Sequence, residues 1–143
     1  LQEPVKPPTF ASSSVAASVV LAAVTLGVFG SAASIGPESV VLRYHEAVSV
    51  RNERELRDIQ LQGNENPFVF ELRVQTTQYL QFRPEVRIQR VASQDREAIV
   101  EVLYDFGPRG RVSKPFILRR QGSFWRIDAE ATQLRLRQTF GLE

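Results

Sequence analysis

The chain has 143 residues, of which 43% are apolar and 24% are charged, a composition typical of a folded domain and not of a disordered chain. It contains no cysteine, which excludes disulfides, thiolate metal sites and a cysteine nucleophile. The formal net charge is only +2, so the basic excess is too small and too dispersed to predict a nucleic-acid partner.

The N-terminal part is free of charged residues between Lys6 and Glu38. Residues 15–35 are long enough to cross about 30 Å of hydrocarbon as a helix. We therefore predict an extended segment over residues 1–10 and a single transmembrane helix over residues 11–35, placed in the lipid bilayer of a bacterial inner membrane. A buried soluble helix and an unprocessed signal peptide are the alternatives. The few flanking basic residues leave the side of the following domain open.

Small residues recur every four positions in the apolar stretch, at Ala23, Gly27 and Ser31. Such a stripe allows two helix backbones to approach closely inside a membrane. It predicts a helix-docking face for another transmembrane subunit. The alternative is that small residues are simply common in this stretch.

The domain after the apolar stretch begins with a helical pattern. Gly36-Pro37 and Glu38 are start signals, and apolar residues then follow helical spacing as far as Gly63. The pattern predicts one long helix over residues 37–62, or two shorter helices with a bend near Asn52.

Beyond Pro67 the apolar residues alternate with polar ones, which is typical of strands with one buried face. Gly-containing turns separate the later strands, and Pro115 indicates a bulge or an edge position. The predicted strands cover residues 68–75, 85–92, 98–106, 112–120 and 124–131. The fold class is therefore α+β: a transmembrane helix, then a long helix packed on a curved antiparallel sheet of four to five strands over residues 36–131.

The run EAIVEVLYDFGPRGRVSKPFILRRQGSFWRIDAE, residues 97–130, resembles the final three strands of the nuclear-transport-factor-2-like superfamily, whose fold is cone-shaped and cystatin-like. The similarity extends over about residues 37–131 and implies that Trp125, in FWRID, packs beneath the helix. The sequence departs from that family in showing one helical region where several helices are usual. A cystatin-like helix on a sheet is the neighbouring alternative.

The resemblance implies a conical cavity, in which enzymes such as ketosteroid-isomerase-like proteins hold an acid or a base. A general base needs burial in that cavity. The single histidine, His45, lies at the boundary of the predicted buried face, and Glu97, Glu101 and Asp105 form an outward row. Asp128 is expected to pair with an arginine of a neighbouring strand. We therefore predict no catalytic residue, no cofactor and no metal ligand.

The last segment, residues 132–143, alternates apolar and charged residues, which indicates a strand extension that docks on a partner. The candidate contact residues are Leu134, Arg135, Leu136, Arg137, Phe140 and Leu142.

Together these features predict a non-catalytic accessory subunit of a multi-subunit bacterial membrane complex, either energy-transducing (respiratory or photosynthetic) or secretory. Its partners would be other membrane protein subunits and the lipid bilayer, without nucleic acid. The alternative is a membrane-tethered small-ligand binder or an isomerase-like enzyme that uses the cone cavity.

Overall fold

The structure, a computed structural model, describes residues 36–141, apart from the side chains of Arg90, Val91, Thr139 and Phe140. The predicted extended segment, the predicted transmembrane helix with Ala23, Gly27 and Ser31, and Leu142 lie outside the described residues. Within residues 36–141, none of the helices combines the length and the apolar character needed to cross a membrane.

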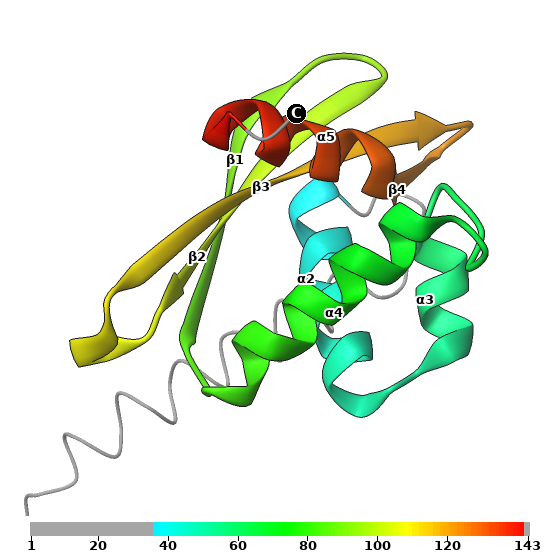
Figure 1. Cartoon of the computed structure of the whole chain (residues 1–143). Helices are drawn as coiled ribbons and strands as arrows, with labels where there is room; N and C mark the ends of the chain where they lie inside the picture. Colours follow the sequence, from blue (N-terminus) through cyan, green and yellow to red (C-terminus); the bar gives the residue numbers. More distant parts are fainter. Residues whose placement is uncertain (1–35, 142–143) are drawn as a thin grey trace, which may run out of the picture. The chain divides into compact units, whose positions relative to one another are not determined.

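The described chain is an α+β domain, as predicted (Figure 1). Three helices come first: α2 (Pro37–Val50), α3 (Glu53–Ile59) and α4 (Pro67–Gln81). A sheet and a last helix follow: β1 (Glu85–Ser93), β2 (Glu97–Asp105), β3 (Arg111–Gln121), β4 (Phe124–Ile127) and α5 (Ala129–Phe140). A short 3-10 turn, Gly107–Arg109, joins β2 to β3.

The sheet is a curled antiparallel meander in which the strands neighbour one another in chain order, β1-β2-β3-β4 (Figure 1). In its centre Val100 pairs with Phe116 and Val102 with Lys114. The short β4 pairs with β3 only from Leu118 onward, so Pro115 lies on a stretch of β3 that β4 does not cover. The prediction of an edge position for Pro115 is therefore confirmed.

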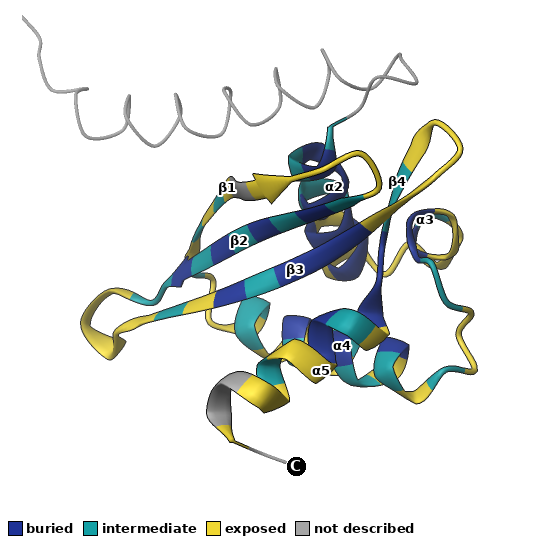
Figure 2. Cartoon of the chain, turned by 90° about the horizontal axis from the view of Figure 1, so that it is seen from above, coloured by how far each residue is buried: buried dark blue, intermediate teal, exposed yellow. Residues whose placement is uncertain are grey.

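The core lies between the sheet and the helices. Buried and less buried residues alternate along β2, so one face of the strand points inward (Figure 2). Val41 and Tyr44 of α2 are buried with Val100 and Val102 of that face. Helix α2 thus lies across the sheet, α4 packs against α2 and α5, and α5 packs against β3.

The predicted bend near Asn52 is confirmed as a break between α2 and α3. Arg51 takes a left-handed backbone conformation with φ of 57°. The Asn52 side chain then accepts a hydrogen bond from the backbone N–H of Glu55 at 3.1 Å and caps α3. Helix α3 ends at Ile59, earlier than the predicted stop at Gly63.

The predicted strand over residues 68–75 is wrong, because this segment is helix α4. The Asn66 side chain accepts a hydrogen bond from the Phe68 N–H at 2.9 Å, and Pro67 occupies the first turn. The buried positions, Val69, Leu72 and Thr76, follow helical spacing, whereas Phe70 is 69% exposed. Three helices therefore precede the sheet, where the sequence analysis predicted one helical region.

The predicted strand extension over residues 132–143 is also wrong, because residues 129–140 form helix α5. The Asp128 carboxylate accepts a hydrogen bond from the Ala131 N–H at 2.9 Å and caps the helix. Gly141 ends it in the left-handed region, with φ of 68°. Thr132 is buried, and its hydroxyl accepts a hydrogen bond from the Ile117 N–H, which ties α5 to β3.

Candidate functional site

A buried hydrogen-bond chain joins α2 to the inner face of the sheet. His45 is only 5% exposed, not at the boundary of the buried face as predicted. Its Nδ1 lies 2.8 Å from the Val41 carbonyl oxygen and its Nε2 lies 2.6 Å from the Tyr104 hydroxyl. A neutral imidazole satisfies both contacts, because Nδ1–H donates to the carbonyl while Nε2 accepts from the hydroxyl.

Burial lowers the pKa of His45 to about 4, because the charged form loses its hydration. The hydrogen bond to Val41 opposes this shift, and the positive charge of Lys114 adds to it. His45 is therefore neutral near pH 7 and works as a structural link. It lines none of the three hollows described below.

Aromatic side chains fill the space between α2 and the sheet. The Phe116 ring lies 5.3 Å from the His45 ring and 5.9 Å from the Tyr44 ring, centre to centre. Tyr79 of α4 lies 4.8 Å from Tyr104. Phe116 thus occupies the interior, whereas Trp125 is half-buried at the edge of the core and Phe70 lies outside it. These rings therefore occupy the space around His45 between α2 and the inner face of the sheet.

The carboxylates on the opposite face of β2 form the outward row that the sequence predicted. Asp105 pairs with Arg111 at 3.2 Å, and Glu97 pairs with Arg119 at 3.2 Å. Glu101 accepts a hydrogen bond from the Ser113 hydroxyl at 2.6 Å. Each carboxylate has a neighbour on the adjacent strand, so the row is a set of cross-strand contacts.

Asp128 has the predicted arginine partner. Arg119 Nε donates to its carboxylate at 2.6 Å, and Gln62 Nε2 donates at 2.7 Å. Burial alone would raise the pKa of Asp128, but these hydrogen bonds and that of the Ala131 N–H lower it overall. Asp128 is therefore an ionised helix cap and not a proton donor.

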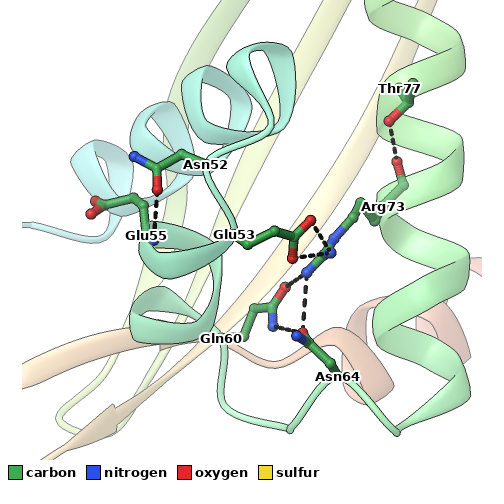
Figure 3. A network of polar contacts seen from close by, with 7 residues as sticks. All are labelled: Asn52, Glu53, Glu55, Gln60, Asn64, Arg73 and Thr77. Atoms are coloured by element: carbon green, nitrogen blue, oxygen red, sulfur yellow. Dashed lines mark hydrogen bonds and ion pairs between the residues drawn. The ribbon is translucent and has the colours of Figure 1, made fainter.

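A polar network holds α4 against α3 (Figure 3). Arg73 of α4 donates to the Glu53 carboxylate of α3 at 2.9 Å. It also donates to Gln60 Oε1 at 2.9 Å and to Asn64 Oδ1 at 3.2 Å. One guanidinium thereby fixes both ends of the loop between the two helices.

A second basic group, Lys114, lies on the inner face of β3 and is only 2% exposed. Its Nζ donates to Gln75 Oε1 at 2.6 Å and lies 5.7 Å from the centre of the Phe116 ring. No carboxylate among residues 36–141 forms an ion pair with it. Burial lowers the pKa of Lys114 to about 8, and the negative charge of Glu71 opposes the shift. The ammonium group therefore remains charged near pH 7 in a poorly hydrated place.

Lys114 opens onto a hollow of about 180 Å³ between α4, β3 and α5. The wall on α5 includes Gln133, which is 3% exposed and whose Oε1 has no hydrogen-bond partner among the described residues. Buried polar atoms without a partner are uncommon in folded proteins, so this wall is a candidate binding site.

The predicted contact residues on α5 fall in different surroundings. Leu134 is exposed, Leu136 is half-buried in the wall of the Lys114 hollow, and Arg135 is exposed. Arg137 lies 3.3 Å from the Glu71 carboxylate and 5.2 Å from the centre of the Phe68 ring. The side chain of Phe140 lies outside the described atoms.

A more open hollow of about 510 Å³ lies along α4 and reaches Arg137 of α5. Phe70 and Val74 line it and are 69% and 37% exposed. A third hollow, of about 210 Å³, lies between α2, α3 and β4 beside Trp125. The open hollow is the one with a large exposed aromatic side chain of α4 in its wall.

Lys114 and Gln133 were not among the site residues predicted from the sequence. A signal for Lys114 was present, because Val112, Lys114, Phe116 and Leu118 share one phase of a strand and three of them are apolar. A charged residue in the buried phase of a strand is unusual. Gln133 offered no such signal, because its burial depends on α5 being a helix.

No cluster of three metal-ligating side chains occurs in the part of the chain that the structure describes. Comparisons of the sequence and fold with protein-family models, curated proteins and solved structures found no match. The functional interpretation therefore rests on the geometry of the site itself.

Proposed function

We propose that this protein is a non-catalytic accessory subunit of a multi-subunit bacterial membrane complex, energy-transducing or secretory. The apolar stretch over residues 11–35 would anchor it in the lipid bilayer, and the domain over residues 36–141 would contact another membrane protein subunit. The cone-like architecture suggested by the sequence resemblance serves here as a scaffold for contact surfaces.

The observation that carries this proposal is the exposed apolar surface on α4. Phe70 and Val74 are 69% and 37% exposed at a hollow of about 510 Å³. Leu134 of α5, which packs beside α4, is 41% exposed. Exposed apolar groups that gather in one region of a surface are typical of protein-binding sites, and aromatic side chains dominate their energetics.

Affinity purification of the tagged full-length chain in mild detergent, followed by mass spectrometry, tests the subunit proposal. We expect membrane proteins to co-purify in stoichiometric amounts. Phe70→Ser should abolish their recovery, because it removes an aromatic contact from the proposed interface. Phe82→Ser is the matched control, since Phe82 is 57% exposed but lies after the end of α4 and outside that hollow.

Recovery of the chain alone, from its native membrane and at native levels, would refute the subunit proposal. Equal loss of partners in both variants would instead exclude the α4 surface as the interface.

The ligand-binding alternative has support from a different observation, the Lys114 hollow. This hollow shares Glu71, Gln75 and Arg137 with the open hollow but does not include Phe70 or Val74.

A further inference from the structure

The hollow beside Lys114 has polar groups that complement a ligand. The Lys114 ammonium group has three N–H donors, and its hydrogen bond to Gln75 Oε1 uses one of them. The Gln133 amide on α5 carries a buried oxygen without a hydrogen-bond donor among the described residues. Both residues line the same cavity, Lys114 from β3 and Gln133 from α5.

The remaining wall is largely apolar. Tyr79, Val112 and Leu136 contribute to it, and the cavity measures about 180 Å³. A cavity of about 150 Å³ is sufficient to hold benzene. The space therefore suits a molecule with a small aromatic or aliphatic body.

The charges restrict the ligand to one negative charge. Lys114 is the buried cation, and His45, which faces it from α2, is neutral near pH 7. At the rim, Glu71 of α4 and Arg137 of α5 pair with each other at 3.3 Å. A monoanion would neutralise Lys114, whereas a dianion would leave an uncompensated charge in a poorly hydrated place.

We propose that this pocket binds a small monocarboxylate that also carries a hydroxyl or amino group. The carboxylate accepts hydrogen bonds from Lys114, and the hydroxyl or amino group donates to Gln133. The pocket lies between β3, α4 and α5, separate from the interior filled by Phe116 and Tyr104. The proposal deepens the ligand-binding alternative and is independent of the subunit proposal.

Calorimetric titration of the full-length chain in detergent micelles tests this inference. The probes are the hydroxybenzoates, benzoate, the corresponding neutral hydroxybenzamides, lactate and inorganic phosphate. We expect at least one hydroxybenzoate or lactate to bind at millimolar concentration or below. The amides should bind at least about tenfold more weakly, which is the usual effect of losing one charge-assisted hydrogen bond. Phosphate should also bind more weakly, because its dianion leaves an uncompensated charge in a poorly hydrated place.

Three variants locate the binding. Lys114→Met keeps the length of the side chain and should reduce carboxylate affinity at least about tenfold. Gln133→Leu should weaken hydroxybenzoates but leave benzoate unchanged, because only the hydroxyl contact is lost. Arg87→Gln is the control, since Arg87 is exposed on β1, pairs with Glu85 at 3.0 Å and does not line this hollow.

Nuclear magnetic resonance titration of the Lys114 ammonium group gives an independent readout. Its pKa, about 8 in the free protein, should rise when the carboxylate binds. Absence of binding by every monocarboxylate probe, or equal affinity in the wild type and Lys114→Met, would overturn the proposal. Neither of these two results would change the expected recovery of protein partners in the purification experiment, so failure of this proposal can be distinguished from failure of the subunit proposal.

Discussion

Two buried basic side chains lie close to the Phe116 ring, and they differ in how completely they are partnered. His45 has a partner for each ring nitrogen, the Val41 carbonyl and the Tyr104 hydroxyl. Among the described residues, Lys114 has one hydrogen bond and no carboxylate ion-pair partner, and a cavity lies beside it. Burial lowers the pKa of both groups, to about 4 and about 8 respectively.

The difference shows how burial can serve either architecture or binding. His45 is neutral near pH 7 and both of its ring nitrogens have hydrogen-bond partners, so its buried polar atoms are satisfied. Lys114 stays charged near pH 7, so the folded protein retains the free-energy cost of burying this charge, which a bound anion would offset. Regions of this second kind are where functional sites are expected.

Phe116→Ala should have the largest effect, because it removes the ring that lies close to both side chains. The side chain is fully buried, and truncation of such a residue costs about 3–5 kcal/mol of the free energy of unfolding. Urea denaturation followed by circular dichroism measures this. Phe124→Ala is the control, since Phe124 is 57% exposed and its truncation should cost less than about 1 kcal/mol. Equal costs for both variants would contradict the assignment of Phe116 to the core.

A pH series tests the His45 side of the comparison. Below pH 6.5 the unfolded chain takes up a proton on this histidine, whereas the folded chain does so only near pH 4. The free energy of unfolding should therefore fall by about 3 kcal/mol as the pH drops through this window, and the loss should level off below it.

His45→Asn removes this titration, so the wild-type and variant curves should converge as the pH falls from 6.5 to 4. The difference between the two curves isolates His45 from the carboxylates that titrate in the same range. Parallel curves would mean that His45 is not buried in its neutral form.

Lys114→Met should have a smaller effect and the opposite sign. Below pH 8 the wild type holds a buried charge that methionine lacks, so the variant should be more stable by about 2 kcal/mol at pH 7. The advantage should disappear as the pH rises from 8 to 10.5, because the unfolded wild type then also loses its proton. Denaturation at pH 7 and at pH 10.5 measures this change, and a destabilised variant at pH 7 would show that Lys114 is a satisfied structural group.

Much of the fold could be predicted from local signals. Pro37, the break at Asn52 and the glycine-containing turns between strands depend on residues next to one another in the chain. Residues 68–75 of α4 were predicted as a strand because apolar residues occupy every second position, at Phe68, Phe70, Leu72 and Val74. Its helical start signal, Asn66-Pro67, outweighs that alternation, and burial of Val69 and Thr76 completes the helix.

The candidate site was harder to predict from the sequence than the fold was. Lys114 could have been recognised by its phase in the strand, but its cavity depends on α4 and α5, both predicted as strands. Gln133 becomes buried only because Asp128 caps α5 and Thr132 ties it to β3. Such contacts join residues distant in the chain, and residue patterns within one segment do not encode them.

The order of elements along the chain also has a consequence for synthesis. The contact between His45 and Tyr104 joins residues 59 positions apart, so α2 leaves the ribosome well before the strand that covers it. Domains form as units and N-terminal parts emerge first. Nascent chains that end before β2 therefore lack the strands that cover the sheet-facing side of α2, although α3 and α4 have already emerged. Once β3 has emerged, Val100 and Phe116 are available to bury that face.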